Sequence, residues 1–93
     1  MEEIEFIDAF SSGVFDDGDG FVEEGAIDIL IDGKEVRLII QQYDDGEETF
    51  LLDDFGYKEL MEYYGIEFYD DEELSGPQSF LDDLHSFYDS QTK

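Results

Sequence analysis

Basic residues are nearly absent from this chain. Its 93 residues include only 4 Lys or Arg against 28 Asp or Glu, and the formal net charge is -24. A small domain ordinarily carries a net charge of about 2 to 8 in magnitude. Nucleic acids and anionic membranes are bound through Lys and Arg. The composition therefore argues against direct binding to either and predicts a positively charged partner.

Cysteine is absent altogether, which excludes disulfides, thiolate metal sites and a Cys nucleophile. Long apolar runs are missing too, since none approaches the roughly 18 residues that a membrane-spanning helix needs. The stretch Met1–Glu5 is acidic where a signal peptide would be basic. We therefore expect a soluble, cytoplasmic protein with no membrane partner.

Apolar residues are nevertheless plentiful. The hydrophobic fraction is 41%, with 9 Phe and 6 Tyr, which is too apolar for a chain that stays disordered. We expect one acidic domain spanning residues 1–93. Because like charges oppose compaction in a chain this small, its stability should rise with added salt.

The pattern predicts a small α+β domain in which a three-stranded antiparallel β-meander packs with two or three short helices. Apolar residues alternate between Phe21 and Ile31, and Asp32–Gly33 is a strong hairpin signal. The return strand is Glu35–Tyr43, which has a β-branched centre. A second turn at Asp44–Glu47 leads into a third strand, Glu48–Leu52.

Two helices are expected in the second half of the chain. Asp53 or Asp54 can cap a helix that runs to about Tyr64, where Gly65 favours an end. Pro77 fits the first position of a last helix. The apolar residues at helical spacing in that last helix are Phe80, Leu81, Leu84, Phe87 and Tyr88.

Three segments lack a clear element. Between Met1 and Val14 a helical stripe and a strand alternation fit about equally, and we favour the helix. The turn-forming residues of Phe15–Gly20 predict an exposed acidic loop. The polar tail Ser90–Lys93 is expected to fray.

Calcium is the one metal that the sequence suggests. Asp17, Asp19 and Gly20 match part of an EF-hand loop, but that alignment places Phe15 at the first ligand position and Ala26 at the last. The first carboxylate and the bidentate Glu are therefore both missing. We expect no metal site and no cofactor.

No catalytic residue stands out either. His85 is the only His, and it can pair with Asp82 or Asp89 across one turn of the last helix. This spacing is typical of a surface or half-buried helix residue. Gly18 and Gly20 lie among acids that would repel a phosphate, so we expect no enzyme.

Carboxylates gather in the predicted turns and at the ends of elements, where side chains can face a partner. A globule of this length is about 32 Å across, and duplex DNA carries roughly 19 charges over that distance. The net charge of the chain is of the same order. Tyr69 adds an aromatic side chain of the type enriched in binding hot spots. The predicted partner-binding residues are Asp16, Asp17, Asp19, Asp44, Asp45, Glu47, Glu48, Asp53, Asp54, Tyr69, Asp70, Asp71, Glu72 and Glu73.

In its small size, strong acidity and many aromatics, the chain resembles the DNA-mimic proteins. This functional class includes anti-restriction and anti-CRISPR proteins of phage and mobile elements. Its members share no single fold or motif, so no residue is carried over. The resemblance implies a non-catalytic inhibitor that occupies the nucleic-acid-binding site of a host DNA- or RNA-binding protein, such as a defence nuclease or a restriction or CRISPR effector. It also implies the host cell cytoplasm, if a phage encodes the chain.

Three alternatives remain open. An immunity-type protein that caps a single cationic toxin nuclease would carry one localised acid patch. A halophilic domain would need molar salt to fold, and a calcium-responsive adaptor would bind calcium. Self-association into a homodimer also stays open.

Overall fold

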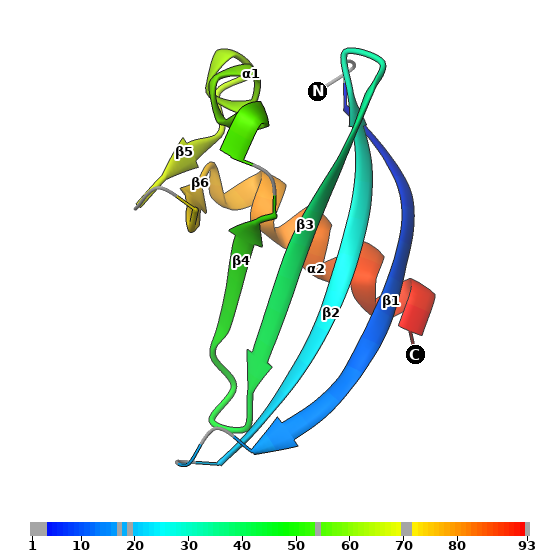
Figure 1. Ribbon diagram of the computed structural model, residues 1–93, viewed down its shortest axis with the longest axis vertical. Helices are drawn as coiled ribbons and strands as arrows, with labels where there is room; N and C mark the ends of the chain where they lie inside the picture. The colour runs from blue at the N-terminus through cyan, green and yellow to red at the C-terminus, as the bar shows by residue number, and fades with distance from the viewer. Residues whose placement is uncertain (1–3, 17, 19, 54, 70–71, 93) are drawn as a thin grey trace.

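The computed structural model describes residues 4–16, 18, 20–53, 55–69 and 72–92. These residues form a four-stranded antiparallel sheet, a small two-stranded sheet and two α-helices (Figure 1). The elements are β1 (Ile4–Asp16), β2 (Phe21–Ile31), β3 (Lys34–Tyr43), β4 (Glu48–Leu52), the 3₁₀ helix η1 (Phe55–Tyr57), α1 (Lys58–Tyr63), β5 (Glu67–Phe68), β6 (Leu74–Gly76) and α2 (Gln78–Thr92).

The α+β class is confirmed, and the three predicted strands form a meander with a fourth strand beside them. That fourth strand is β1, so the helix favoured for residues 1–14 is wrong. β1 pairs with β2 from Ile4 opposite Ile31 to Asp16 opposite Phe21, with register shifts after Phe6 and after Ser11. Each shift adds an unpaired residue and reverses the alternation, which explains why the sequence pattern fitted a strand no better than a helix.

Both predicted turns are confirmed. Asp32 and Gly33 have positive φ angles of 53° and 76°, the geometry of the two-residue turn that matches strand twist. β3 begins at Lys34, one residue before the expected Glu35. At the second turn the Gly46 N–H donates to the Tyr43 carbonyl at 3.0 Å.

The predicted acidic loop at residues 15–20 is shorter than expected, because β1 continues through Asp16. Gly18 and Gly20 lie in bends. Asp17 and Asp19 fall outside the described residues.

Helix α1 starts later than the sequence predicted. It follows η1, and its N-cap residue Tyr57 makes no side-chain capping hydrogen bond, so capping by Asp53 is wrong. Its expected end is confirmed, because Gly65 has φ 88° and donates its N–H to the Glu62 carbonyl at 3.0 Å. Asp54, the other proposed cap, lies outside the described residues.

A small β5–β6 hairpin joins the edge of the main sheet. The Leu52 N–H donates to the Glu72 carbonyl at 2.7 Å, and Leu51 forms an antiparallel bridge with Glu73. These backbone hydrogen bonds connect the second half of the chain to β4.

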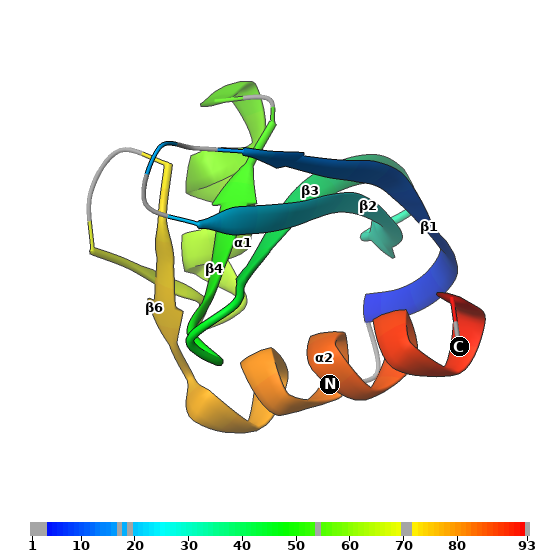
Figure 2. The ribbon, with the colours of Figure 1, turned by 90° about the horizontal axis from the view of Figure 1, so that it is seen from below.

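Helix α2 covers one face of the four-stranded sheet (Figure 2). We call this the helix-side face and the opposite one the open face. Ile27, Ile29 and Ile31 of β2 are fully buried, because alternate residues of a strand face the same side. From α2 the buried side chains are Phe80, Leu84 and Tyr88, as the predicted apolar spacing requires. Each such side chain contributes about 1.5–3 kcal/mol when fully buried.

The last turn of α2 is held in place. Ser90 Oγ donates to the Phe87 carbonyl at 2.9 Å, and Thr92 Oγ1 donates to the Tyr88 carbonyl at 2.8 Å. The predicted fraying of this tail is therefore wrong for residues 90–92. None of the described helices has the length and apolarity needed to cross a membrane.

Tyr88 joins the end of α2 to the first half of β2. Its hydroxyl donates to Glu23 Oε2 at 2.9 Å. A Cβ added at Gly25 would lie 2.5 Å from Tyr88 Cε1 and Oη, and 2.6 Å from the Phe10 carbonyl oxygen. Only glycine lets the ring approach the strand this closely. Burial, followed by the hydrogen bond to Glu23, raises the pKa of Tyr88 to about 12.

Gly25→Ala is expected to destabilise the protein by about 1–3 kcal/mol, because the new methyl group overlaps the Tyr88 ring and the β1 backbone. Urea unfolding measures the change. Gly76→Ala is the matched control, since a Cβ there meets nothing within 4 Å. Equal stability of the two variants would contradict the close packing of Tyr88 on β2.

Tyr88 also predicts a pH dependence at the alkaline end. Its pKa is raised from the ordinary value of about 10 for a tyrosine to about 12 in the folded protein, so the unfolded chain loses this proton first. The stabilisation is complete below about pH 10 and is lost as the pH rises to about 12. The free energy of unfolding should therefore fall more steeply over this range in the wild type than in Tyr88→Phe. Parallel curves would show that Tyr88 is not the group responsible.

Candidate partner-binding surface

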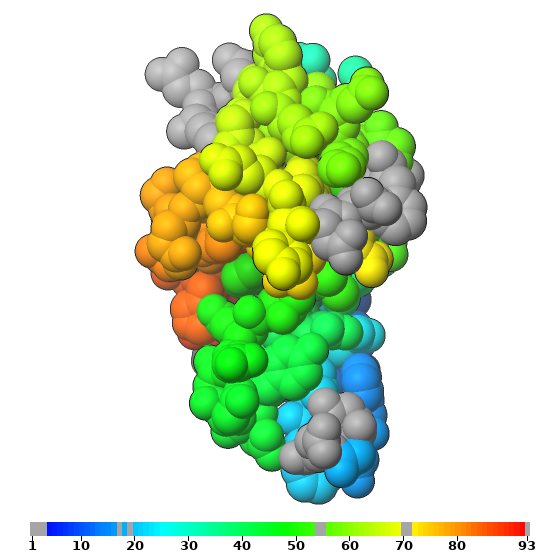
Figure 3. All heavy atoms as spheres, turned by 90° about the vertical axis from the view of Figure 1, so that its left-hand side faces the viewer, coloured from blue at the N-terminus to red at the C-terminus, as the bar shows by residue number. Residues whose placement is uncertain are grey.

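Two of the predicted acid clusters lie together at one end of the sheet. Consecutive strands of a meander run in opposite directions, so the β1–β2 connection and the β3–β4 turn share an end (Figure 1). The Phe21 N–H donates to Asp44 Oδ2 at 3.2 Å, which joins the two segments directly. In Figure 3 the β3–β4 turn, in green, lies beside the ends of β1 and β2, in blue and cyan. We call this region, residues 14–16, 18, 20–23 and 42–48, the loop end.

Acids at the loop end are exposed but locally fixed. Asp16 Oδ1 accepts from the Gly18 N–H at 2.8 Å, and Asp45 Oδ1 accepts from the Glu47 N–H at 3.0 Å. Such turns hold the carboxylate against its own backbone. Asp16, Asp44, Asp45 and Glu47 are all exposed, so the loop end presents ordered negative charges to solvent.

Glu48 differs from its neighbours because its carboxylate is engaged within the protein. Oε2 accepts from Gln42 Nε2 at 3.0 Å and lies 2.6 Å from His85 Nδ1, while His85 Nε2 lies 2.9 Å from Asp89 Oδ2. Of the two partners that helix spacing offered His85, Asp82 and Asp89, the structure pairs it with Asp89. Its second partner, on β4, was not foreseeable from helix spacing.

Of the remaining predicted acids, those that the structure describes form a second group along the β4 edge. The β5–β6 hairpin places Glu72 and Glu73 beside Leu52 and Leu51, just before Asp53. Asp53 and Glu72 are exposed, whereas Glu73 is half-buried. Asp54, Asp70 and Asp71 lie outside the described residues. In the part of the chain that the structure describes, the predicted acid clusters thus form two groups, one at the loop end and one along the β4 edge.

Tyr69 stands next to this second group. Its side chain is 80% exposed, and its N–H donates to the Glu73 carbonyl at 2.8 Å. The neighbouring Phe68 packs against the core instead. An exposed aromatic ring beside acids is the arrangement expected of a binding surface.

The open face carries an ion pair that the sequence interpretation missed. Arg37 Nε and Nη2 donate to the two oxygens of Asp28 at 2.8 and 3.1 Å, and the guanidinium carbon lies 5.2 Å from the centre of the Phe10 ring. The hydrogen bond to Asp28 and the charge of Asp28 raise the pKa of Arg37 above its ordinary value. Asp28 and Arg37 line a surface hollow together with Glu35, Asp53 and Tyr57.

The sequence contains enough information to predict this ion pair between Asp28 and Arg37. A two-residue turn at Asp32–Gly33 places Asp28 directly opposite Arg37 in the predicted hairpin. Opposite charges on directly opposed residues of two strands attract each other. The hairpin register, once predicted, therefore identified both residues.

Large apolar side chains at the loop end were also missed. Val14 is 62% exposed, Phe15 46% and Phe21 60%. A shallow groove of about 250 Å³ runs here on the molecular surface, lined by Val14, Phe21, Glu23, Gln42, Tyr43 and Asp44. Strand alternation places Phe21 on the same face as the buried Ile27, and nothing in the sequence indicated how far α2 reaches along that face.

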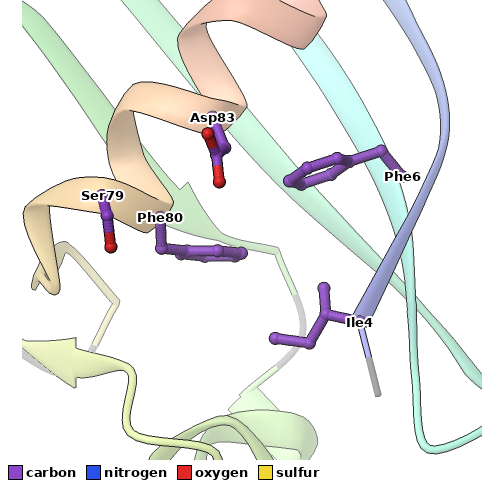
Figure 4. A pocket seen from close by; sticks show the side chains of 5 residues that line it. All are labelled: Ile4, Phe6, Ser79, Phe80 and Asp83. Carbon is purple, nitrogen blue, oxygen red and sulfur yellow. The ribbon is translucent and has the colours of Figure 1, made fainter. Parts of the chain in front are cut away.

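A smaller hollow of about 100 Å³ lies between β1 and the start of α2. Figure 4 shows the side chains of Ile4, Phe6, Phe80 and Asp83 converging on it. The Phe6 ring stacks on Phe80 and Phe87, with centroids 6.3 and 5.2 Å apart. Ser79 also lines it, but among the residues described around this hollow there is no His or Lys to activate that hydroxyl.

Within the part of the chain that the structure describes, no group of three or more His, Cys, Asp or Glu could hold a metal ion. Asp17 and Asp19, which suggested calcium, are not in that part. The described residues therefore contain no set of ligands that would support the calcium hypothesis.

No protein-family model, curated protein or solved structure matches this chain. The resemblance to DNA-mimic proteins therefore remains a hypothesis from composition. Any function has to follow from the residues and their geometry.

Proposed function

We propose that this protein is a non-catalytic inhibitor that fills the nucleic-acid-binding site of a positively charged protein with carboxylates and so excludes the nucleic acid. The observation that carries the proposal is charge density. A net charge of -24 is held in a globule of 37 × 27 × 21 Å. Duplex DNA carries roughly 22 charges along 37 Å of its axis, so the two are alike in charge for their length.

The spread of the charge supports mimicry over an immunity-type protein. A protein that caps one toxin would need a single acid patch. Here exposed acids occur on strands, turns and helices alike, on both sides of the sheet. They include Glu5, Asp8, Asp32, Glu35, Asp45, Glu47, Asp53, Glu59, Glu62, Glu67, Glu72, Asp82 and Asp83.

Carboxylates can replace phosphates chemically, because both accept paired hydrogen bonds from a guanidinium group. Among the described residues, Asp28 accepts such a pair of hydrogen bonds from Arg37. Of the basic residues that the structure describes, Arg37 is held by Asp28, and Lys58 lies 5.8 Å from the Phe68 ring centre. Because the sequence has 28 Asp or Glu and only 4 Lys or Arg, most carboxylates are left for a partner's Arg and Lys.

Opposite potentials of this strength make association fast and sensitive to salt. A pull-down from the native host should therefore recover a nucleic-acid-binding protein, and added DNA or RNA should displace it. Its affinity should fall steeply as salt is raised from about 50 to 200 mM. Recovery of no cationic partner, or a partner that nucleic acid cannot displace, would refute the proposal.

Neutralising substitutions should locate the contact. Asp16→Asn, Asp45→Asn and Glu47→Gln together remove three charges from the loop end and keep the side-chain oxygens that fix its turns. The control Glu59→Gln, Glu62→Gln and Asp82→Asn removes three charges from α1 and α2. We expect the loop-end variant to bind its partner at least about tenfold more weakly than the control, a difference of about 1.4 kcal/mol. Urea unfolding should show similar stability for both.

The sequence-based hypothesis gives the run Asp70–Glu73 the same role, so its four neutralised residues form a third variant. Its loss of affinity, compared with that of the loop-end variant, shows which group dominates. If both variants bind as well as the helix control, the contact lies on neither group.

A further inference from the structure

The loop end exposes large apolar side chains beside its carboxylates. Phe21 is 60% exposed and Val14 62%, whereas Ile27, Ile29 and Ile31 on the same strand as Phe21 are fully buried. On the helix-side face, burial along β2 therefore stops before Phe21, whereas Val22 on the open face is buried. These side chains are not used by the core of the protein.

The end of α2 explains where burial stops. Tyr88 is the last buried residue of α2, and it reaches Gly25 and Glu23 on β2. The strands continue past the helix toward the loop end (Figure 1). The helix-side face beyond Glu23 is therefore left open to solvent.

Register brings the exposed side chains together. Val14 lies opposite Glu23, and Asp16 lies opposite Phe21. Val14 and Phe21 are thus diagonal neighbours on one face of an antiparallel pair, within contact distance for large side chains. Phe15, which is 46% exposed, lies opposite Val22 on the other face. Together they make an apolar tip that spans the edge of the sheet.

Carboxylates surround this apolar tip. Glu23 and Asp44 line the groove together with Phe21 and Val14, and Asp44 also holds the Phe21 N–H at 3.2 Å. The backbone that carries the ring is therefore fixed. An aromatic anchor within a polar rim is the usual anatomy of a binding hot spot.

Charge complementarity limits what can cover this tip. A second copy of this chain would bring another net charge of -24, and the repulsion opposes pairing. A purely basic surface would satisfy the acids but leave Phe21 in water. A segment with an aromatic side chain between basic ones satisfies both.

We propose that the loop end docks a segment in which basic and aromatic side chains alternate, the arrangement by which proteins hold single-stranded nucleic acid. Phe21 then occupies the place of an unstacked base, and Asp44 and Asp45 occupy those of adjacent phosphates. This inference rests on the proposed function and narrows the target to a protein with a single-strand site.

Two synthetic peptides test the inference without a known partner, one alternating arginine with tryptophan and the other arginine with alanine. The wild type should bind the tryptophan peptide about tenfold more tightly, as burial of an aromatic ring allows. Phe21→Ala should remove most of that preference, and Val14→Ser should reduce it. Tyr63→Ala is the matched control, because Tyr63 is 82% exposed on α1, and it should keep the preference. Isothermal titration at low salt measures all four proteins.

Equal affinity of the wild type for the two peptides would overturn the inference and leave the proposed function standing. A preference lost in Tyr63→Ala but kept in Phe21→Ala would do the same. If neither peptide binds at low salt, the proposed function itself fails. Sedimentation that shows a dimer dependent on Phe21 would assign the tip to a second copy and overturn the inference as well.

Discussion

The structure depends on the contact between α2 and one face of the sheet. A net charge of -24 pushes the chain apart, and the apolar side chains of that contact have to offset the repulsion. Phe80, Leu84 and Tyr88 meet a layer of fully buried residues from β2 and β3. Because the helix, the sheet and the β5–β6 hairpin meet around this layer, it also fixes where the acidic turns point.

The preference of Asp and Gly for tight turns explains why the acids of this chain gather on its surface at the strand ends. Asp and Gly are the residues that tight turns favour, so a meander rich in both places its acids at the strand ends. Asp44 shows the link, since its carboxylate both contributes charge and bonds the Phe21 N–H. In the apolar tip, Val14 and Phe21 are exposed because they lie on the helix-side face beyond Tyr88, the last buried residue of α2. The same helix therefore builds the core and leaves the tip uncovered.

Sequence patterns predicted the elements that depend on interactions between residues close together in the chain. The hairpin at Asp32–Gly33, the strand Glu48–Leu52 and the apolar spacing of α2 followed from turn propensity and periodicity. β1 was not predicted as a strand, because its two register shifts reverse the alternation of apolar and polar residues. β6 was not predicted, because a strand of three residues carries no periodic signal. The joining of two acid clusters at the loop end needed the order of the strands. The exposure of Phe21 needed the length of sheet that α2 covers, which is a tertiary property.

The most direct test of the central claim is zero-length carboxylate-to-lysine crosslinking of the protein to its recovered partner, read by mass spectrometry. We predict crosslinks from acids of the loop end, such as Asp45 and Glu47, to lysines of the partner's nucleic-acid-binding site. Excess nucleic acid should abolish them. Crosslinks to lysines outside that site, or crosslinks that persist with nucleic acid bound, would contradict the account.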